Sequence, residues 1–253
     1  MRPHQRPKKA TRGHPGNTSS EIEDPNFPIF FYMPNDHPYS LFCQWKSTSF
    51  TVPRESLTWL RIAHPGHADI SSNPTEPPNV ASAPTNLSFN CAEQFMMFCK
   101  ALYFHHKHSA NLIMSTTSPS LQKKYGRAIP DFQDFLWRQS CERVAFEGNW
   151  WKFARNEARR NFLLGTGEKM LCEASSMDRR WGIGYKENHA MRYRGNWGEN
   201  LLGKAIMRVR QKVRERLKEM EFEGRNAEDW ELPGKEMWVA NDEGITTARQ
   251  ESR

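Results

Sequence analysis

Long apolar runs are missing from this sequence of 253 residues, and no stretch approaches the ~18 consecutive apolar residues that a membrane-spanning helix needs. The first residues also lack the apolar segment of a secretory signal. We therefore expect no membrane association and a cytoplasmic location, with the nucleus as the alternative. GxSxG, HExxH, protein-kinase, Walker and GxGxxG patterns are absent as well, and Gly165-Thr166-Gly167 follows no clear strand. These absences argue against the enzyme classes that those motifs define.

Cysteine is sparse, and its spacing fits neither a disulfide framework nor a zinc site. The chain has five cysteines, an odd number, and no CxxC pair. This pattern argues against a disulfide framework and a structural zinc site, and it predicts reduced, buried thiols. The cluster His105-His106-Lys107-His108 has no partners at metal-ligand spacing, so we expect no metal there.

The chain has more positively than negatively charged residues. The 36 Lys and Arg residues exceed the 29 Asp and Glu residues, which gives a formal net charge of +7. An excess of positive charge favours an anionic partner, such as nucleic acid, a nucleotide or phosphate. It does not choose among them.

Composition divides the chain into three parts. Residues 1–26 read as a disordered basic arm, residues 27–218 as one folded domain, and residues 219–253 as a flexible acidic tail. Within the domain, the Pro- and Ser-rich stretch 53–85 reads as an inserted surface loop. We predict an α+β class: a mainly helical single domain packed on a small β-sheet of short N-terminal strands.

Apolar spacing predicts where the elements lie. The run Ile29-Phe30-Phe31-Tyr32 predicts a strand, and residues 39–52 could hold another. Helical spacing predicts helices over 91–104, 118–124, 132–146, 151–164 and 201–217. No internal repeat is found.

The first candidate for chemistry is Asn90-Cys91-Ala92-Glu93, directly before an apolar helix. Asn90 as N-cap and Glu93 three residues later would form a capping box, which is a purely structural role. The alternative is catalytic. Glu93 and Lys100 fall on one helical face, and the helix dipole would keep the Glu93 carboxylate ionised, as a general base requires.

Two further segments combine glycine with polar side chains. Residues 173–185 place an acid, Glu173, a second carboxylate, Asp178, two arginines and Trp181 beside Gly182 and Gly184, whose backbones permit close approach of a ligand. The alternative is an Asp-started turn with solvated arginines and an anchoring tryptophan. Residues 195–203 lead into the last helix, where Asn200 fits an anion site or an ordinary N-cap.

Several blocks in a consistent order give the chain a resemblance to the NADAR-domain family, also called the YbiA-like family. The blocks, which run from about Phe30 to Leu217, are Ile29–Tyr32, Tyr39–Phe42, Ala92–Met97 with Lys100-Ala101, Gly126-Arg127, Trp137, Lys152-Phe153 with Asn156, Leu163–Gly167, Glu173–Ser175 with Asp178–Gly184, and Trp197–Lys204. The sequence departs from the family pattern in the longer stretch 53–85 and in Ser176, where many relatives have proline.

The resemblance implies an N-glycosidase. Family members remove phosphorylated riboflavin-pathway intermediates, and some are credited with removing ADP-ribose from guanine, so the implied partner is a small phosphorylated nucleoside or an ADP-ribosyl substrate, including ADP-ribosylated nucleic acid. No metal or redox cofactor is implied. The oligomeric state is left open.

The resemblance also implies roles for individual residues. It suggests Glu93 and Asp178 as the catalytic pair, Glu93 activating water and Asp178 stabilising charge on the ribose, with exchanged roles as the alternative. The candidate substrate-binding residues are Lys100, Arg127, Trp137, Trp181, Gly182, Tyr32 and Asn200.

Two other classes of function remain open from the sequence. One is a non-catalytic ADP-ribose or nucleotide reader that uses the same pocket. The other is a nucleic-acid-associated basic protein that uses the basic arm and the arginines Arg155, Arg159 and Arg160.

Overall fold

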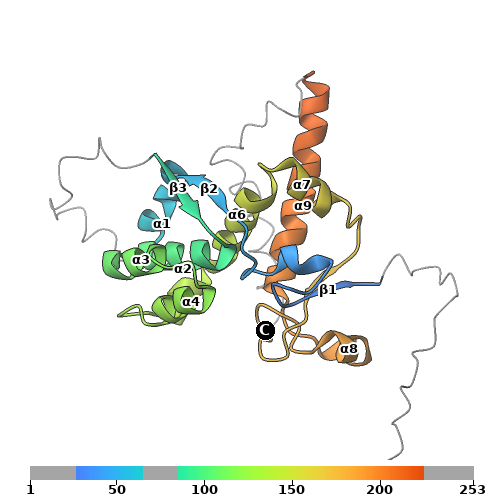
Figure 1. Ribbon diagram of the computed structural model, residues 1–253, viewed down its shortest axis with the longest axis horizontal. Helices are drawn as coiled ribbons and strands as arrows, with labels where there is room; N and C mark the ends of the chain where they lie inside the picture. Colours follow the sequence, from blue (N-terminus) through green and yellow to red (C-terminus); the bar gives the residue numbers. More distant parts are fainter. Residues whose placement is uncertain (1–26, 65–84, 225–253) are drawn as a thin grey trace, which may run out of the picture.

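The computed structural model describes residues 27–64 and 85–224, and within them the chain is mainly helical (Figure 1). The helices are α1 (Thr58–Ala63), α2 (Ala92–Tyr103), α3 (Lys107–Met114), α4 (Pro119–Arg127), α5 (Asp134–Arg138), α6 (Cys141–Phe153), α7 (Glu157–Leu164), α8 (Glu187–Ala190) and α9 (Leu201–Phe222). The strands are β1 (Ile29–Phe31), β2 (Phe50–Pro53), β3 (Asn86–Phe89) and β4 (Leu171–Glu173). Short 3₁₀ helices occupy Tyr39–Phe42, Arg54–Leu57 and Met191–Asn196. This confirms the predicted class.

The strands form two separate two-stranded sheets instead of the single N-terminal sheet that we predicted. β2 pairs antiparallel with β3, whereas β1 pairs in parallel with β4, which lies some 140 positions later in the chain, with Ile29 opposite Leu171. The prediction missed β4 because Leu171-Cys172-Glu173 contains no β-branched or aromatic residue, whereas β1, which is equally short, consists of Ile29, Phe30 and Phe31.

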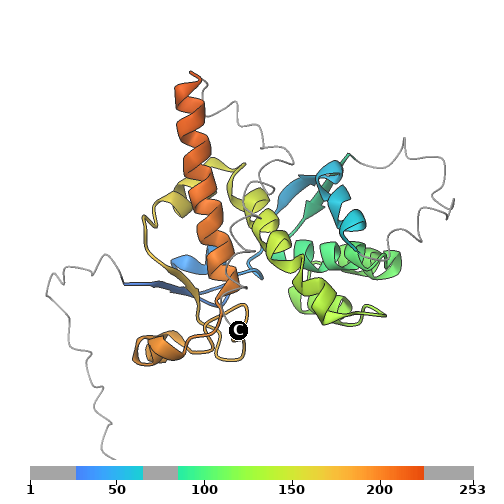
Figure 2. The same ribbon diagram turned by 180° about the vertical axis from the view of Figure 1, so that it is seen from behind.

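Helix α6 lies between the group formed by α2, α3 and α4 and the long helix α9, as both views show (Figures 1 and 2). It contacts α2 on one side and α9 on the other. Trp150, Lys152 and Phe153 are fully buried in it. A helix that is covered on nearly all sides has no amphipathic period. The predicted break between residues 146 and 151 is therefore wrong, and α6 runs through to Phe153.

Other boundaries also differ from the prediction. Residues 54–63, predicted as the beginning of a loop, form a 3₁₀ helix and α1, and Leu60 is fully buried. α9 continues to Phe222, beyond the predicted start of the flexible tail. The predicted basic arm, most of the predicted inserted loop and the tail after residue 224 lie outside the described residues. No described helix is both long and apolar enough to cross a membrane.

The parallel sheet has two different faces, and this positions the site. Ile29, Phe31 and Leu171 belong to the main core, whereas Phe30 and Cys172 belong to a second, smaller core. Side chains alternate along a strand, so Glu173 projects on the same face as Leu171, toward the main core.

The close packing of α9 on β4 gives a stability prediction. A Cβ atom at Gly203 would lie 2.0 Å from the Leu171 carbonyl oxygen, which is too close for any side chain. We expect Gly203→Ala to lower the free energy of unfolding by about 2 kcal/mol or more, because the backbone of β4 or α9 must shift. The matched control is Gly195→Ala, where a Cβ atom meets nothing within 4 Å. Equal denaturant midpoints for the two variants would contradict the described packing.

Candidate active site

Glu93 does not cap the N-terminus of α2. The N-cap position is Cys91, which makes no side-chain capping bond. Gln94 makes the reciprocal bond instead, since its Oε1 accepts from the Asn90 N–H at 2.8 Å. The Asn90 side chain donates to the Thr117 carbonyl. The capping box of Asn90 and Glu93 is therefore wrong, and the catalytic alternative for Glu93 stays open.

The Glu93 carboxyl group is buried with only part of its hydrogen-bonding capacity used. Its side chain is 7% exposed, Oε2 accepts from Trp45 Nε1 at 3.2 Å, and Oε1 has no partner in the described part of the chain. Burial raises the pKa of Glu93, against the opposing effects of Lys123, Trp45 and Arg127. The helix dipole was expected to keep the group ionised, but the loss of hydration is the larger effect here.

Helix α6 holds the loop that carries Trp45. Lys152 Nζ donates to the Cys43 carbonyl at 3.1 Å, and Gln44 Nε2 donates to Asn149 Oδ1 at 3.3 Å. The Gln44 carbonyl in turn accepts from the Glu93 N–H. Burial lowers the pKa of Lys152 to about 8. These buried polar bonds fix the indole beside the carboxylate.

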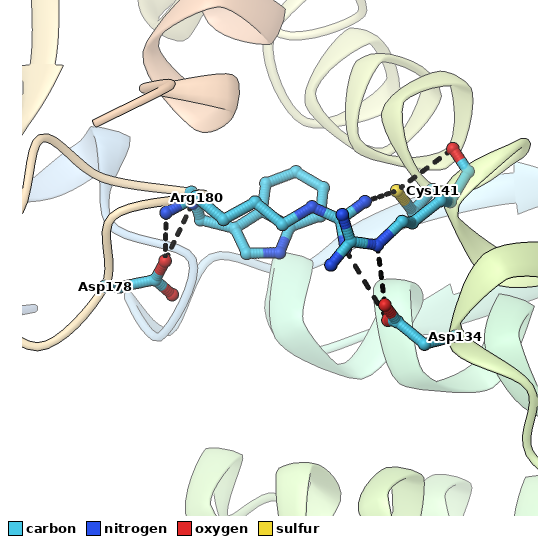
Figure 3. Close-up of polar contacts among 6 residues, drawn as sticks. Asp134, Cys141, Asp178 and Arg180 are labelled. Carbon is cyan, nitrogen blue, oxygen red and sulfur yellow. Dashed lines mark hydrogen bonds and ion pairs between the residues drawn. The ribbon is translucent and has the colours of Figure 1, made fainter.

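Asp178 lies in a tight turn that its own side chain stabilises. Oδ1 accepts from the backbone N–H groups of Arg180 at 2.9 Å and Trp181 at 2.8 Å, which is an Asx-type arrangement. Figure 3 shows Arg180 extending from this turn toward Asp134 and Cys141. Its guanidinium lies 3.7 Å from Asp134 Oδ1 and donates to Cys141 Sγ at 3.3 Å. Arg180 is therefore not simply solvated, because it fastens the turn to α5 and α6.

Glu173 is the acid of this segment to which the sequence assigned no role. It ends β4, and its Oε2 is buried with no partner among the described groups. Its pKa is raised to about 7, first by burial and then by the charge of Asp178; Glu93 adds to the rise and Lys123 opposes it. The only sequence signal for it was its place at the start of the Glu-Ala-Ser block.

The pKa of Glu173 links it to the two acids that the sequence suggested. Glu93 and Asp178 both act on Glu173, and Lys123 acts on both Glu93 and Glu173. The backbone adds a contact, since a Cβ atom at Gly182 would lie 2.7 Å from the Glu173 carbonyl oxygen and 3.1 Å from that of Asp178. We therefore group Glu93 and Asp178 with Glu173 as the candidate acids, and their joint action on one sugar stays a prediction.

Three basic residues near Glu93 differ in their exposure and in their hydrogen-bond partners. Lys123 and Arg127 are four residues apart on α4 and so lie on one face of it; Arg127 is exposed and Lys123 is half-buried. Lys100 is buried, donates to the Gly126 carbonyl at 2.9 Å and lies 3.6 Å from the Phe132 ring centre. Burial lowers its pKa to about 8. Lys100 thus connects α2 with α4, and its role toward phosphate stays a prediction.

The two candidate tryptophans occupy different environments. Trp137 is 6% exposed and packs edge-on against Tyr103 in the main core, with ring centres 5.7 Å apart. Trp181 is half-buried, follows the Asp178 turn and packs against the edge of the same core. Of the two, Trp181 has more surface to offer a ligand.

Gly182 and Asn200 support β4 directly. A Cβ atom at Gly182 would lie 2.7 Å from the Glu173 carbonyl oxygen, so the close approach that needs glycine is to the protein's own strand. Asn200 has a left-handed backbone with φ of 52°, accepts from the Glu173 N–H and donates to the Leu171 carbonyl. Asn200 occupies the N-cap position without making a capping bond, because its side chain binds β4.

Tyr32 lies apart from the carboxylates. It is 40% exposed and lines an open cleft of about 1310 Å³ beside β1, together with Ala174 and the start of α8. The cleft runs along β1, since Ile29, Phe30 and Phe31 all line it, and it reaches Ala174 next to Glu173 in the chain. Neither this cleft nor a smaller hollow of about 400 Å³ that includes Gly184 and Tyr193 is lined by Glu93, Glu173 or Asp178. We place the candidate site at the carboxyl groups, because buried, incompletely bonded titratable groups are more specific to catalysis than the size of a hollow.

Two further observations bear on the alternatives. Among the described residues, no group of three or more His, Cys, Asp or Glu side chains is arranged to hold a metal ion. Arg159 donates to the carbonyls of Ser49 and Lys152, and Arg160 donates to that of Ala154. These two arginines therefore support the fold, which weakens the case for a nucleic-acid surface built on them.

The bond from Trp45 gives a prediction for the ionisation of Glu93. We expect Trp45→Phe to raise the pKa of Glu93 further, because a bond that favours the carboxylate is lost while the side chain stays aromatic. Titration of ¹³C-labelled glutamate carboxyl groups by NMR measures the change. Trp59→Phe is the matched control, since Trp59 Nε1 donates to Glu147 in the same way at 3.0 Å. A titration of Glu93 that shifts equally in both variants, or in neither, would show that Trp45 does not control this group.

Two known proteins are similar in sequence to about half of this chain. The chain is 38% identical over 122 residues to N-glycosidase R617 of Acanthamoeba polyphaga mimivirus, covering 47% of this chain and 72% of the viral protein. It is 34% identical over 131 residues to Protein irg-1 of Caenorhabditis elegans, covering 50% of this chain and 62% of that protein.

The fold is similar to the NMR structure of the E. coli protein YbiA, with a TM-score of 0.53 and 18% sequence identity over 77% of this chain and 89% of YbiA. The model of the NADAR domain matches residues 30–214, which is most of the described structure. The chain therefore belongs to the NADAR domain family.

Proposed function

We propose that the protein is an N-glycosidase that hydrolyses the bond between ribose and a base or amine nitrogen. The observation that carries the proposal is the incomplete bonding of two acids, since buried Glu93 and half-buried Glu173 each have a buried oxygen without a partner among the described residues. Both Glu93 and Asp178 raise the pKa of Glu173. The similarity to a viral protein named as an N-glycosidase supports it. Cleavage of an N-glycosidic bond builds positive, oxocarbenium-like charge on the sugar, and carboxylates stabilise such charge.

The surroundings of each carboxylate suggest its role. Burial raises the pKa of Glu93, so in its charged form it is a stronger base than an exposed glutamate, which suits removal of a proton from water. The Asx-type turn fixes Asp178 in direction, which suits stabilisation of the ribose charge or binding of a ribose hydroxyl. Trp181, directly beyond this turn, would stack on the base.

A phosphorylated sugar matches the charge beside the carboxyl groups. Lys123 and Arg127 lie along one face of α4, and both act on Glu93. A guanidinium binds phosphate through two parallel hydrogen bonds, and exposed Arg127 is placed to do so. The proposed substrates are therefore a phosphorylated ribosylaminopyrimidine or an ADP-ribosylated guanine, and the proposed reaction uses no metal ion.

The carboxylates can be tested by single substitutions. We expect Glu93→Gln and Asp178→Asn each to lower kcat at least ~100-fold, since one loses the base and the other the stabilising charge. Circular dichroism and thermal unfolding should show both variants folded. Glu147→Gln is the matched control, because Glu147 is also buried and bonded to an indole but lies outside the site. Wild-type turnover by both site variants would refute the mechanism.

A turnover screen separates the substrate classes. Purified protein is incubated with a phosphorylated ribosylaminopyrimidine and with ADP-ribosyl-guanosine, free and within DNA, and released base is measured by chromatography. Hydrolysis of one of these identifies the substrate. Tight binding of ADP-ribose by wild-type protein without release of any base would instead establish a non-catalytic reader.

A further inference from the structure

The proposed hydrolysis lacks one component, because the leaving nitrogen needs a proton. An amine or guanine nitrogen that departs without one carries negative charge, which makes it a poor leaving group. Glu93 acts as a base and Asp178 as an anion, so neither supplies this proton. The inference that follows rests on the proposed function and assigns the missing step.

We propose that Glu173, in its protonated form, is the general acid that protonates the leaving nitrogen as the glycosidic bond breaks. Three lines of observation carry this assignment: its fixed position on β4, the burial of its unpartnered oxygen, and the charges that surround it.

The backbone of Glu173 is held from several sides. Its N–H donates to Asn200 Oδ1 at 3.1 Å, its carbonyl accepts from the Ile183 N–H at 2.9 Å, and its Cα pairs with that of Phe31. Gly182 packs closely on the same carbonyl. A catalytic acid must be held within hydrogen-bonding reach of the atom it protonates, and a strand held in this way provides that precision.

The side chain is not engaged as a structural carboxylate would be. Oε2 is buried without a partner among the described residues. Glu147 shows the contrast, since its buried carboxyl group accepts from both Arg143 and Trp59. An unpartnered buried oxygen is costly to a fold. Its presence on a side chain whose pKa is raised by both Glu93 and Asp178 is what a site awaiting substrate would show.

The surrounding charges favour the protonated form. Asp178 and Glu93 both repel negative charge on Glu173, and Lys123 opposes them. The resulting pKa of about 7 leaves the group partly protonated at neutral pH. A general acid is most effective when its pKa is close to the working pH.

The step balances without a co-reactant. The oxygen of water bonds to the anomeric carbon as the bond between that carbon and nitrogen breaks. The proton of Glu173 goes to the nitrogen, and a proton of the water goes to Glu93. The products are the sugar with a new hydroxyl group and the free base, and solvent returns the proton from Glu93 to Glu173.

The leaving group provides the test. Glu173→Gln and wild-type protein are compared on a phosphorylated ribosylaminopyrimidine, whose nitrogen needs a proton, and on nicotinamide mononucleotide, whose pyridinium nitrogen leaves as a neutral base without one. We expect Glu173→Gln to lower kcat about 100-fold or more on the first substrate and less than ~10-fold on the second. The fall in wild-type activity above pH ~7 should disappear in the variant.

Three results would overturn the assignment. Equal losses on both substrates would make Glu173 a structural residue, and unchanged activity on both would make it irrelevant. If wild-type protein hydrolyses neither of these substrates nor ADP-ribosyl-guanosine, the proposed function is refuted, and the acid role with it.

A measurement without turnover keeps the two failures apart. NMR titration of ¹³C-labelled carboxyl groups should place the Glu173 midpoint near 7 and lower it in Asp178→Asn, because a repelling charge is removed. A midpoint near the ordinary 4.5 would refute the acid role even in an active N-glycosidase.

Thermal unfolding gives a second readout. The folded protein binds the Glu173 proton more tightly than the unfolded chain, so the stability that this group contributes is present at low pH and is lost as pH rises through 7. Glu173→Gln should therefore raise Tm relative to wild-type protein at pH 8 but not at pH 4. A merely structural carboxyl group, as in the control Glu147→Gln, should lower Tm when substituted.

Discussion

The site depends on carboxyl groups that lose their hydration on folding. The protein replaces only part of that hydration with hydrogen bonds. Glu93 and Glu173 each bury an oxygen with no partner in the described structure, and burial is the largest cause of the raised pKa of both. A protein rarely retains such groups unless function requires them. The remaining features of the site can be understood as the means by which the fold holds these groups in place.

Structural contacts act on the site from three directions. Helix α6 anchors the loop that carries Trp45 through Lys152 and Asn149. Arg180 fastens the Asp178 turn to α5 and α6 (Figure 3). Asn200 joins the N-terminus of α9 to β4 and thereby fixes the strand that ends in Glu173. Asn200, which the sequence suggested as a substrate-binding residue, thus binds the backbone of β4 instead and holds the strand that carries a reacting group.

The sequence predicted those elements whose pattern is local. The helices at 92–103 and 201–222 have apolar residues at helical spacing and were found. The limits of α6 were misplaced because its sequence lacks such a period, and β4 was missed because it has no β-branched or aromatic residue. The convergence of Glu93 and Asp178 rested on the resemblance to a family, since spacing along the chain cannot bring residues 85 positions apart together. Glu173 was passed over because its significance lies in burial and in its neighbours' charges, which only the folded chain shows.

The central claim is that the sugar binds among the three carboxyl groups and not in the larger cleft beside Tyr32. A crystal structure of the Glu93→Gln variant with intact substrate tests this directly. We expect the anomeric carbon to lie between residue 93 and Asp178. The leaving nitrogen should lie within hydrogen-bonding distance of Glu173, and the phosphate near Arg127. Substrate found in the cleft formed by Tyr32, Ala174 and the start of α8, with the carboxyl groups untouched, would contradict it.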